Sequence, residues 1–450
     1  MCELRKIKYK GIYHLYNYAF QTDCEIKIPL KGKHLTTQSV IQELSEITCP
    51  KCLKTLEREK FEIVKNPYQL DLYDLISVGK RVNNSKRNFL FISKVLGKHL
   101  EVKPDIVKAT GKLLLSTKYN FNAINLVNYL HNQNINIKSE FAELISEDKK
   151  ILVIGFAETA TGLGMSLAAS IRNCTYVTTT REHILDKNTV FTFEEEHSHA
   201  TTHKLYFSDF DKFDQVFLVD DEITTGKSML NIITAIKNVS NINDFSIFSL
   251  LDWRNNENKK QYEELQEELN ISIHNYSLIS GTICEETKEP LPKDKETELT
   301  DEEKERYDFR VLERENNYWK NSGKFGVEQK EIQQLENSCE EIAEKIEEIL
   351  RNENLKQDDK ILILGHGENI YIPSRIASYL HYDTYFKTTT RSPIYCDGEI
   401  IKDRNYFYDK DVKYYFYNKE EVEEKYKKII MIAEGDCKIK LCNNMMIVKV

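Results

Sequence analysis

The sequence has no apolar run that approaches the roughly 18 residues a membrane-crossing helix needs. Residues 1–8 lack the apolar core of a secretory signal peptide. The chain also has no excess of positive charge. Its formal net charge of −9 at pH 7 argues against non-specific nucleic-acid binding by the whole chain. We therefore expect a cytoplasmic protein with no membrane partner and no strong affinity for nucleic acid.

Cysteines at metal-site spacing are scarce as well. The ten cysteines are scattered, and Cys49 and Cys52 form a lone CxxC. A structural zinc site needs four ligands, and although Cys24 or His34 could contribute, a second close-spaced pair is absent. Two reduced thiols at a turn are the simpler interpretation, with zinc as the alternative.

Length and composition predict a globular protein of two or three domains. The chain has 450 residues, of which 40% are hydrophobic and 30% charged, and domains average about 150 residues. Residues 285–305 hold ten acidic residues, four lysines and two prolines, which is typical of a linker or a charged surface helix. The predicted domains are a small β-rich module, a main domain, charged linker helices and a C-terminal domain, over residues 1–62, 63–285, 286–345 and 346–450.

The most informative stretch covers residues 215–228, with the sequence QVFLVDDEITTGKS. Four apolar residues predict a buried strand, which Asp220 and Asp221 follow directly. A polar turn then leads into a segment whose apolar residues have the spacing of a helix. Its backbone N–H groups and hydroxyls would face a phosphate at a helix N-terminus. The turn residues are Thr224, Thr225, Gly226, Lys227 and Ser228.

The two acidic residues can accept hydrogen bonds from sugar hydroxyls or approach a divalent metal, so the stretch predicts a ribose 5-phosphate cradle. A Walker loop is excluded because Asp221 stands where its first glycine should be, and a dinucleotide fingerprint is excluded because Leu167 replaces its third glycine. An ordinary strand, polar turn and helix is the remaining alternative.

A second buried strand, residues 150–155, precedes a loop of small residues suited to close backbone approach to an anion. Ala157, Thr159 and Thr161 are the expected donors. Glu158 is unusual in such a loop and fits better as a ligand of a metal-bound water or as the partner of a basic side chain.

Thr-Thr-Thr-Arg at residues 178–181 ends a third strand, and a histidine-rich segment follows. Residues 215–228 resemble type I phosphoribosyltransferases, in which a mobile loop at this chain position closes over the reacting centre. That resemblance implies that Arg181, His199 and His203 could donate to a departing pyrophosphate. A surface loop with chance histidines and a zinc cluster are the alternatives.

Residues 80–112 form the most basic window, with nine lysines or arginines and two acidic residues. A solvated basic face is the usual explanation. The alternative is a set of side chains that helps to hold a polyanion, namely Arg81, Arg87, Lys94, Lys98 and His99.

An internal repeat aligns residues 151–181 with residues 361–391 without a gap, with eight identities in 31 positions. Both copies predict a strand, a Gly-x-x-Glu loop, a helix, a strand and Thr-Thr-Thr-Arg. The second copy lacks the acidic pair and threonine turn, because its later strand, residues 428–433, is followed by Glu-Gly-Asp. We interpret it as a degenerate duplicate, with chance similarity as the alternative. Its polar residues could bind part of a substrate or complete a shared cleft: His366, Glu368, Arg375, Arg391 and Ser392.

Residues 215–228 resemble the phosphoribosyl pyrophosphate motif of type I phosphoribosyltransferases. The blocks at residues 80–99, 155–164 and 365–393 resemble one bacterial branch, found with tellurite-resistance and related stress genes. In that branch an orotate phosphoribosyltransferase-like domain precedes a TRSP-type C-terminal domain. The resemblance covers roughly residues 65 to 450.

The resemblance implies an α/β fold with a type I phosphoribosyltransferase-like parallel sheet, a second repeat-like α/β domain and a small N-terminal β-rich module. It implies that Asp220 and Asp221 hold the ribose hydroxyls and Mg²⁺, that these two and Glu158 are catalytic, and that the threonine turn holds the 5-phosphate. Ligands would gather at the carboxyl ends of the strands.

The implied reaction moves ribosyl 5-phosphate between phosphoribosyl pyrophosphate and a nitrogen acceptor, making or breaking an N-ribosidic bond. Its implied setting is nucleoside-like metabolite synthesis in stress response or defence. A regulatory protein that binds the donor without turnover, and a hydrolytic or phosphorolytic enzyme, are the alternatives. The acceptor and the oligomeric state, including a homodimer, stay open.

Overall fold

The computed structural model describes residues 5–9, 12–16, 61–82, 89–133, 135–184, 187–194, 202–283, 296–299, 308–311, 323–434 and 439–450. The chain divides into a smaller unit, residues 1–64 with 281–286, and a larger unit that holds the rest. In the smaller unit β1 (Arg5–Tyr9) pairs antiparallel with β2 (Ile12–Tyr16), as a β-rich module predicts. Cys24, His34, Cys49 and Cys52 lie outside the described residues, so the zinc alternative stays untested there.

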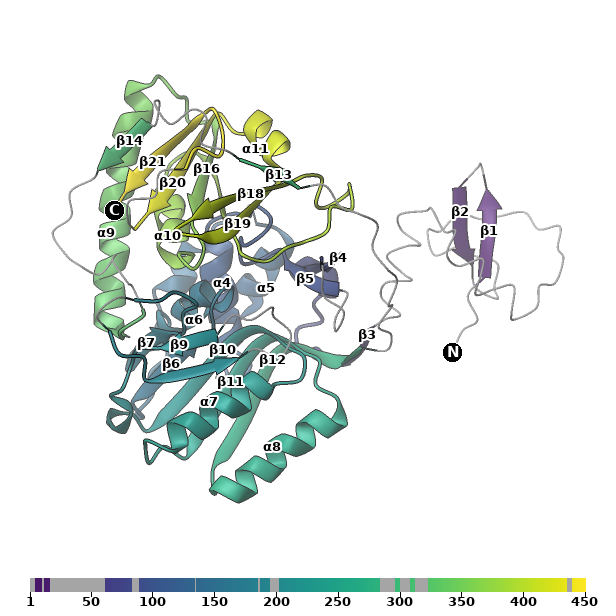
Figure 1. The fold of residues 1–450 in the computed structure, drawn as a ribbon, viewed down its shortest axis with the longest axis vertical. Coiled ribbons are helices and arrows are strands. Elements are labelled where there is room, and N and C mark those ends of the chain that lie inside the picture. Colours follow the sequence, from purple (N-terminus) through teal and green to yellow (C-terminus); the bar gives the residue numbers. More distant parts are fainter. Residues whose placement is uncertain are drawn as a thin grey trace. The chain divides into compact units, whose positions relative to one another are not determined.

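The first half of the larger unit is a parallel sheet with one short antiparallel edge strand (Figure 1). Its strand order is β15 (Val327–Glu328), β7 (Cys174–Thr178), β6 (Ile151–Gly155), β10 (Gln215–Ile223), β11 (Asp244–Asp252) and β12 (Ser272–Ile283). Every residue of β6 is buried. This is expected for a central parallel strand covered on both faces, and it explains why the strand reads as a continuous apolar run.

Helices cover both faces of this sheet. On one face α6 (Ala160–Ala168) packs on β6, β7 and β10, and α4 (Asp105–Leu115) packs on α6 and on α5 (Ile124–His131). On the other face lie α7 (Lys227–Lys237) and α8 (Asn256–Leu269), which contact each other (Figure 1).

The second half is a five-stranded sheet with all strands parallel. Its order is β14 (Asp308–Val311), β21 (Met445–Lys449), β20 (Lys428–Ala433), β16 (Lys360–Gly365) and β17 (Asp383–Thr388). The helix α10 (Tyr371–Tyr379) packs on β16 and β17 and contacts α9 (Gln329–Asn352), α4 and α6. A short helix, α11 (Lys419–Lys425), precedes β20.

Small hairpins complete the larger unit. They are β4 (Ile76–Lys80) with β5 (Phe89–Ser93), β8 (Phe191–Glu194) with β9 (Thr202–Leu205), and β18 (Arg404–Asp409) with β19 (Val412–Tyr417). The short helix α3 (Leu72–Leu75) leads into β4, and β13 (Thr297–Glu298) pairs with β18. The remaining strand, β3, covers Phe61–Lys65.

The structure confirms the predicted repeat of elements. The strand, loop, helix and strand of the first copy are β6, α6 and β7, and those of the second are β16, α10 and β17. Each copy then forms a bridge from its threonine turn to a hairpin strand, Thr180 to Lys204 and Thr390 to Tyr415. The α/β fold class with a parallel sheet and a second repeat-like α/β part is therefore confirmed.

A buried ionic network ties the two halves together. The Glu336 carboxylate on α9 accepts hydrogen bonds from Arg375 Nε on α10 at 3.0 Å and from Lys108 Nζ on α4 at 3.0 Å. Arg375 Nη1 also donates to Asp105 at 2.8 Å. Burial raises the pKa of Glu336, but Arg375 and Lys108 outweigh it and lower that pKa to about 2. Arg375 is therefore committed to this network and not to an open site.

No helix within the described residues is long and apolar enough to cross a membrane.

Candidate functional site

The predicted acidic pair lies inside β10, whose last residues extend past the end of β6. Val219 pairs with Gly155, the last residue of β6, whereas Asp220 and Glu222 pair only with β11. The carboxylates were expected to follow the strand, so the strand is longer than the apolar pattern indicated. Its overhang places the two half-buried acidic side chains at the carboxyl end of the sheet, where ligands of open α/β sheets bind.

The carboxylates at this edge are crowded. Asp220 Oδ1 accepts the backbone N–H of Asp221 at 2.9 Å. Burial raises the pKa of Asp221, neighbouring Glu222 raises it further, and Lys98 only partly opposes them. A cation or a hydrogen-bond donor placed here would relieve this repulsion.

The threonine turn follows at once and opens α7. Gly226 is the N-cap, with φ +79°, and the Thr225 hydroxyl accepts the Lys227 N–H at 3.4 Å. A Cβ at this position would lie 2.2 Å from the Tyr262 hydroxyl, which donates to Gly226 O at 2.8 Å. Only glycine fits, because the backbone is left-handed here and the ring closes over it. The positive end of the helix makes the turn suited to an anion.

A second layer holds Tyr262 in place. The Arg254 guanidinium lies 4.2 Å from the Tyr262 ring centroid. Arg254 also makes a bidentate contact with Asp252, Nε at 2.9 Å and Nη2 at 2.7 Å. The region after β11 therefore supports the cradle from behind.

The predicted anion loop after β6 is buried by the second half of the chain. Glu158, Thr159 and Thr161 are only 2%, 6% and 6% exposed. The Ala157 N–H donates to Thr179 Oγ1 at 2.9 Å, and Thr161 Oγ1 donates to Glu368 O at 2.8 Å. In this structure these donors face protein acceptors, so their predicted contact with a ligand phosphate stays a prediction.

Glu158 instead takes part in a reciprocal contact between the halves, which we call the clasp. Its carboxylate accepts Thr390 Oγ1 at 3.0 Å and the Arg391 N–H at 3.2 Å. The equivalent residue, Glu368, accepts Thr180 Oγ1 at 2.6 Å and the Arg181 N–H at 2.8 Å. Each Gly-x-x-Glu loop therefore reaches the Thr-Thr-Thr-Arg turn of the other half.

Each clasp carries a lysine from a Gly-Lys pair. Lys98 Nζ donates to Thr159 Oγ1 at 2.7 Å and lies 3.5 Å from Glu158, while Lys324 Nζ lies 3.9 Å from Glu368. Burial raises the pKa of Glu158, but Lys98, Arg181 and Arg391 together lower it below its ordinary value. Glu158 is thus the partner of a basic side chain, one of the two roles expected for it.

The glycines before these lysines also accept backbone hydrogen bonds from the opposite half. Thr388 of the second half donates its N–H to Gly97 O at 2.8 Å, and Thr178 of the first half donates to Gly323 O at 2.7 Å. Sequence reasoning missed Lys324 and this pairing, because the two Gly-Lys pairs stand at different distances before their strands. Their shared dipeptide was the only signal.

The remaining predicted donors have separate places. His203 is fully buried, with its Nδ1 3.1 Å from Thr179 Oγ1, and His199 lies outside the described residues. Lys94 Nζ donates to Tyr73 O at 2.7 Å. Both ring nitrogens of His99 are buried without a hydrogen bond, and burial followed by Lys98 lowers its pKa. Among the described basic side chains of this window, Lys98 contacts the predicted loop, and Arg87 lies outside the described residues.

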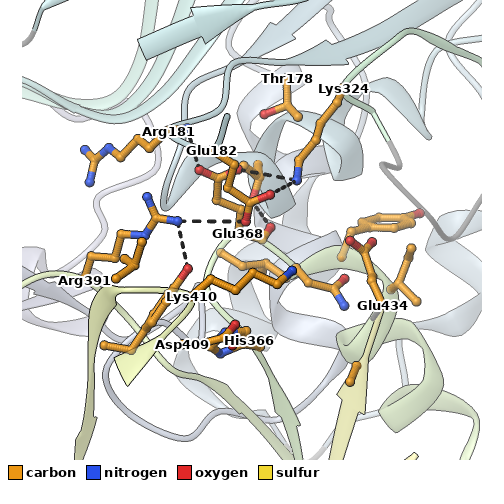
Figure 2. Close-up of a pocket in the computed structure, with 18 of the residues that line it drawn as sticks. Thr178, Arg181, Glu182, Lys324, His366, Glu368, Arg391, Asp409, Lys410 and Glu434 are labelled. Carbon is orange, nitrogen blue, oxygen red and sulfur yellow. Dashed lines mark hydrogen bonds and ion pairs between the residues drawn. The ribbon is translucent and has the colours of Figure 1, made fainter. Parts of the chain in front are cut away.

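A cavity of about 540 Å³ lies between the two halves (Figure 2). Arg181 comes from the first half, His366, Glu368 and Arg391 from the second, and Lys324 from the segment before α9. None of the described residues 220–228 lines it, so it is separate from the predicted cradle. Sequence reasoning anticipated His366, Glu368 and Arg391 as cleft residues. It missed Glu182, Lys204, Asp409, Lys410 and Tyr414, which become neighbours only after folding.

Magnesium fits the donor set at the cradle. Mg²⁺ in enzymes is usually held by one or two carboxylates together with substrate phosphates. Asp220 and Asp221 supply two crowded carboxylates beside a phosphate-suited turn. Within the described ranges no group of three or more His, Cys, Asp or Glu side chains could hold a metal by itself. The residues thus suit an ion that is shared with a substrate.

Two family models match the chain. Residues 75–282 match the model described as "Phosphoribosyl transferase" (PRTase_2), and residues 321–448 match "TRSP domain C terminus to PRTase_2". Together they cover well over half of the sequence. The chain belongs to the phosphoribosyltransferases that carry a TRSP domain, which makes it a glycosyltransferase-type enzyme. No curated protein matches the sequence significantly.

Solved phosphoribosyltransferases are similar at low identity. An adenine enzyme from Trypanosoma brucei, in complex with AMP, pyrophosphate and ribose-5-phosphate, is 12% identical, over 48% of this chain and 86% of that chain, with a TM-score of 0.29. The Leishmania tarentolae adenine enzyme is 14% identical over 51% and 87%, with a TM-score of 0.26. The orotate enzyme of Mycobacterium tuberculosis H37Rv is 14% identical over 45% and 89%, with a TM-score of 0.23. At these values the likeness transfers no residue role to this chain.

Proposed function

We propose that the first half uses phosphoribosyl pyrophosphate and Mg²⁺ to make or break an N-ribosidic bond to a nitrogen acceptor. The observation that carries this is the overhanging end of β10. There, Asp220 and Asp221 stand just before the threonine turn that opens α7, in a chain with a phosphoribosyltransferase domain.

In this proposal Asp220 and Asp221 accept hydrogen bonds from the ribose hydroxyls and fix the sugar. The turn from Thr224 to Ser228 receives the 5-phosphate through its N–H groups and hydroxyls. Bound magnesium would supply positive charge to the pyrophosphate leaving group. The protein's contribution is mostly positioning and charge, because the sugar gains positive character as the bond breaks.

Lys98 has a supporting place in the same proposal. It lowers the pKa values of both Asp221 and Glu158, and its Nζ donates to Thr159. It therefore favours the ionised form of Asp221 in the cradle and of Glu158 in the clasp. Glu158, named above as a catalytic candidate, would act by holding the loop from Ala157 to Thr161 against the second half. Arg181 and His203 remain candidates for the pyrophosphate side.

The finer setting is also part of the proposal. The blocks at residues 80–99 and 155–164 resemble the tellurite-resistance branch, which supports a role in nucleoside-like metabolite synthesis during stress. The acceptor base is left open.

The test is isotopic exchange of pyrophosphate into phosphoribosyl pyrophosphate with candidate acceptors, in the full-length chain. Asp220→Asn with Asp221→Asn should lower the exchange rate at least about 100-fold, because the sugar loses both carboxylate contacts. The matched control is Asp211→Asn, an exposed residue before the opposite end of β10. Donor binding without any exchange would instead support a regulatory protein, and full activity in the double variant would reject this site.

A further inference from the structure

The cavity between the halves has the size and lining of a ligand site of its own. Its volume of about 540 Å³ falls in the range of small-molecule pockets, which runs from about 300 to 1,000 Å³. Its lining includes four apolar residues, Met165, Ile370, Ile372 and Val412. The rest is polar and charged. Such a mixed wall is typical of sites that orient a small polar metabolite.

The charges of the lining favour an anion. Five lysines or arginines stand against four carboxylates: Arg181, Lys204, Lys324, Arg391 and Lys410 against Glu182, Glu368, Asp409 and Glu434. Lysine and histidine side chains of the same wall pair with three of the carboxylates. Lys324 Nζ lies 2.7 Å from Glu182 and 3.9 Å from Glu368, and His366 Nε2 lies 3.2 Å from Asp409.

Lys324 keeps its charge in this setting. Burial lowers its pKa, but Glu368 and Glu182 raise it by more, so the pKa ends above the ordinary lysine value. Lys410 sits at the turn between β18 and β19 and is exposed. Figure 2 shows the ends of Lys324, Lys410 and Glu434 around one space, although they come from three separate segments.

Two residues of the wall also carry buried donors that have no acceptor. Asn369 Nδ2 and Arg391 Nε are shielded from solvent and make no hydrogen bond in the described structure. Buried N–H groups are nearly always paired, and an unpaired one costs free energy. Because both atoms are shielded from solvent, a ligand in the cavity could accept hydrogen bonds from them only after these side chains turn toward it.

Glu434 adds the feature that distinguishes a sugar phosphate from a simple anion. It follows β20 directly, and the strand registers place Ala433 and Glu434 where β10 has Asp220 and Asp221. A carboxylate accepts hydrogen bonds from hydroxyls but repels phosphate oxygens. A ligand with both phosphoryl oxygens and hydroxyls suits a wall in which the cations Lys324 and Lys410 and the carboxylate of Glu434 lie around one space.

We propose that this cavity is a second binding site, in addition to the cradle of the first half, and that it takes a small phosphorylated sugar or sugar-containing phosphate. The second half would then have lost the threonine turn of the first copy but kept a binding role. Its residues come from both halves, so the site exists only while the clasp is closed.

The experiment measures binding of ribose 5-phosphate by calorimetry to the full-length chain. The background is Asp220→Asn with Asp221→Asn, so that the cradle does not contribute. One equivalent should still bind. Lys410→Glu should weaken this binding at least tenfold, because a cation becomes a like charge. Lys427→Glu is the matched control, since Lys427 is exposed at the opposite end of β20 and does not line the cavity. Both lysines are exposed, so neither variant threatens the fold, and unchanged melting temperatures check this.

Glu434→Gln tests the sugar part of the proposal. It should weaken ribose 5-phosphate while leaving the weaker binding of inorganic phosphate unchanged. Equal weakening of ribose 5-phosphate and inorganic phosphate binding would overturn the proposal that the ligand contains a sugar.

No residual binding in the cradle-deficient chain, or residual binding that ignores Lys410→Glu, overturns the second site. The proposed transferase reaction is judged separately by pyrophosphate exchange. An exchange-inactive chain that still binds in a Lys410-dependent manner would reject the first proposal and keep this one.

Discussion

At the end of β10 the first half carries Asp220 and Asp221, whereas the second half carries Ala433 and Glu434 at the matching positions after the same kind of strand. The halves agree, in contrast, in the Gly-x-x-Glu loop and in the Thr-Thr-Thr-Arg turn. The agreement falls on the residues that join the halves, and the divergence falls on those that would hold a donor. The second copy has therefore kept its part in the assembly of the pair while its ligand chemistry changed.

In both copies the glutamate of the Gly-x-x-Glu loop is buried, whereas the acidic residues at the strand end are partly exposed. Glu158 and Glu368 are 2% and 8% exposed and are saturated by hydrogen bonds from the opposite half. The acidic residues after the strands are half-buried and line the edges where ligands would bind. The residues that both copies share thus make contacts inside the protein. The residues that differ between the copies lie at its accessible edges.

The largest expected effect comes from breaking the network that joins the halves. Glu336→Gln should lower the free energy of unfolding by about 3–5 kcal/mol, because Arg375 and Lys108 keep their charges in a buried site where only Asp105 remains as a countercharge. Urea unfolding at pH 7 measures this. Glu340→Gln, exposed on the same helix, is the control. A loss below 1 kcal/mol would show that the network does not hold the halves together.

Low pH should reduce the difference in unfolding free energy between the wild-type chain and Glu336→Gln. The pKa of Glu336 is lowered from 4.5 to about 2, so its carboxylate contributes stability that is complete above pH 4.5 and is lost as the pH falls toward 2. The gap between the wild-type chain and Glu336→Gln should therefore be smaller at pH 3 than at pH 7. A gap that widens in acid would contradict the assigned charge state.

A medium effect tests whether the two clasps are equivalent. Thr390→Val and Thr180→Val each remove a hydroxyl that donates to a buried carboxylate and accepts a backbone N–H, from Ser392 and Glu182 respectively. Each should cost about 1.5–3 kcal/mol of unfolding free energy. Thr390→Ser and Thr180→Ser, which keep the hydroxyl, should recover most of it. A large loss of unfolding free energy in only one of the two valine variants would show that the two clasps have the same geometry but do not contribute equally to stability.

The smallest expected loss is that of Gly398→Ala, in a turn of the second half that shares the backbone conformation of the cradle turn. Gly226 and Gly398 have φ of +79° and +78°, but a Cβ meets Tyr262 at 2.2 Å in the first and nothing within 4 Å in the second. Both alanine variants should lose about 1–2 kcal/mol from left-handed strain. Gly226→Ala should lose about 1–3 kcal/mol more by overpacking and should also slow transfer. Equal losses in thermal unfolding would show that Tyr262 moves away freely.

Much of the sheet could be predicted, because fully buried parallel strands are written as apolar runs. β6 and β20 lie where those runs predicted them. The length of β10 could not be predicted from such a run, since its last residues pair with only one neighbour and carry acidic side chains. The helix α9 begins at Gln329, where a glutamate- and glutamine-rich opening masks the apolar spacing of Ile332 and Leu335.

The candidate site divides in the same way. The acidic pair and the threonine turn are local in sequence, and the repeat could be found by aligning the chain with itself. The clasp joins Glu158 to Thr390, and no local pattern indicates a partner more than 200 residues away. The cavity depends on the same long-range contacts, so its lining could be named only in part.

The clasp has a consequence for how the protein behaves at low abundance. Both partners of each contact belong to one polypeptide, so dilution cannot separate them, and each carboxylate meets its threonine at an effective concentration set by the covalent connection. Two independent subunits joined by the same few bonds would come apart in a scarce population. Fusion of the two copies therefore guarantees a one-to-one pairing in every molecule, however few molecules a cell makes.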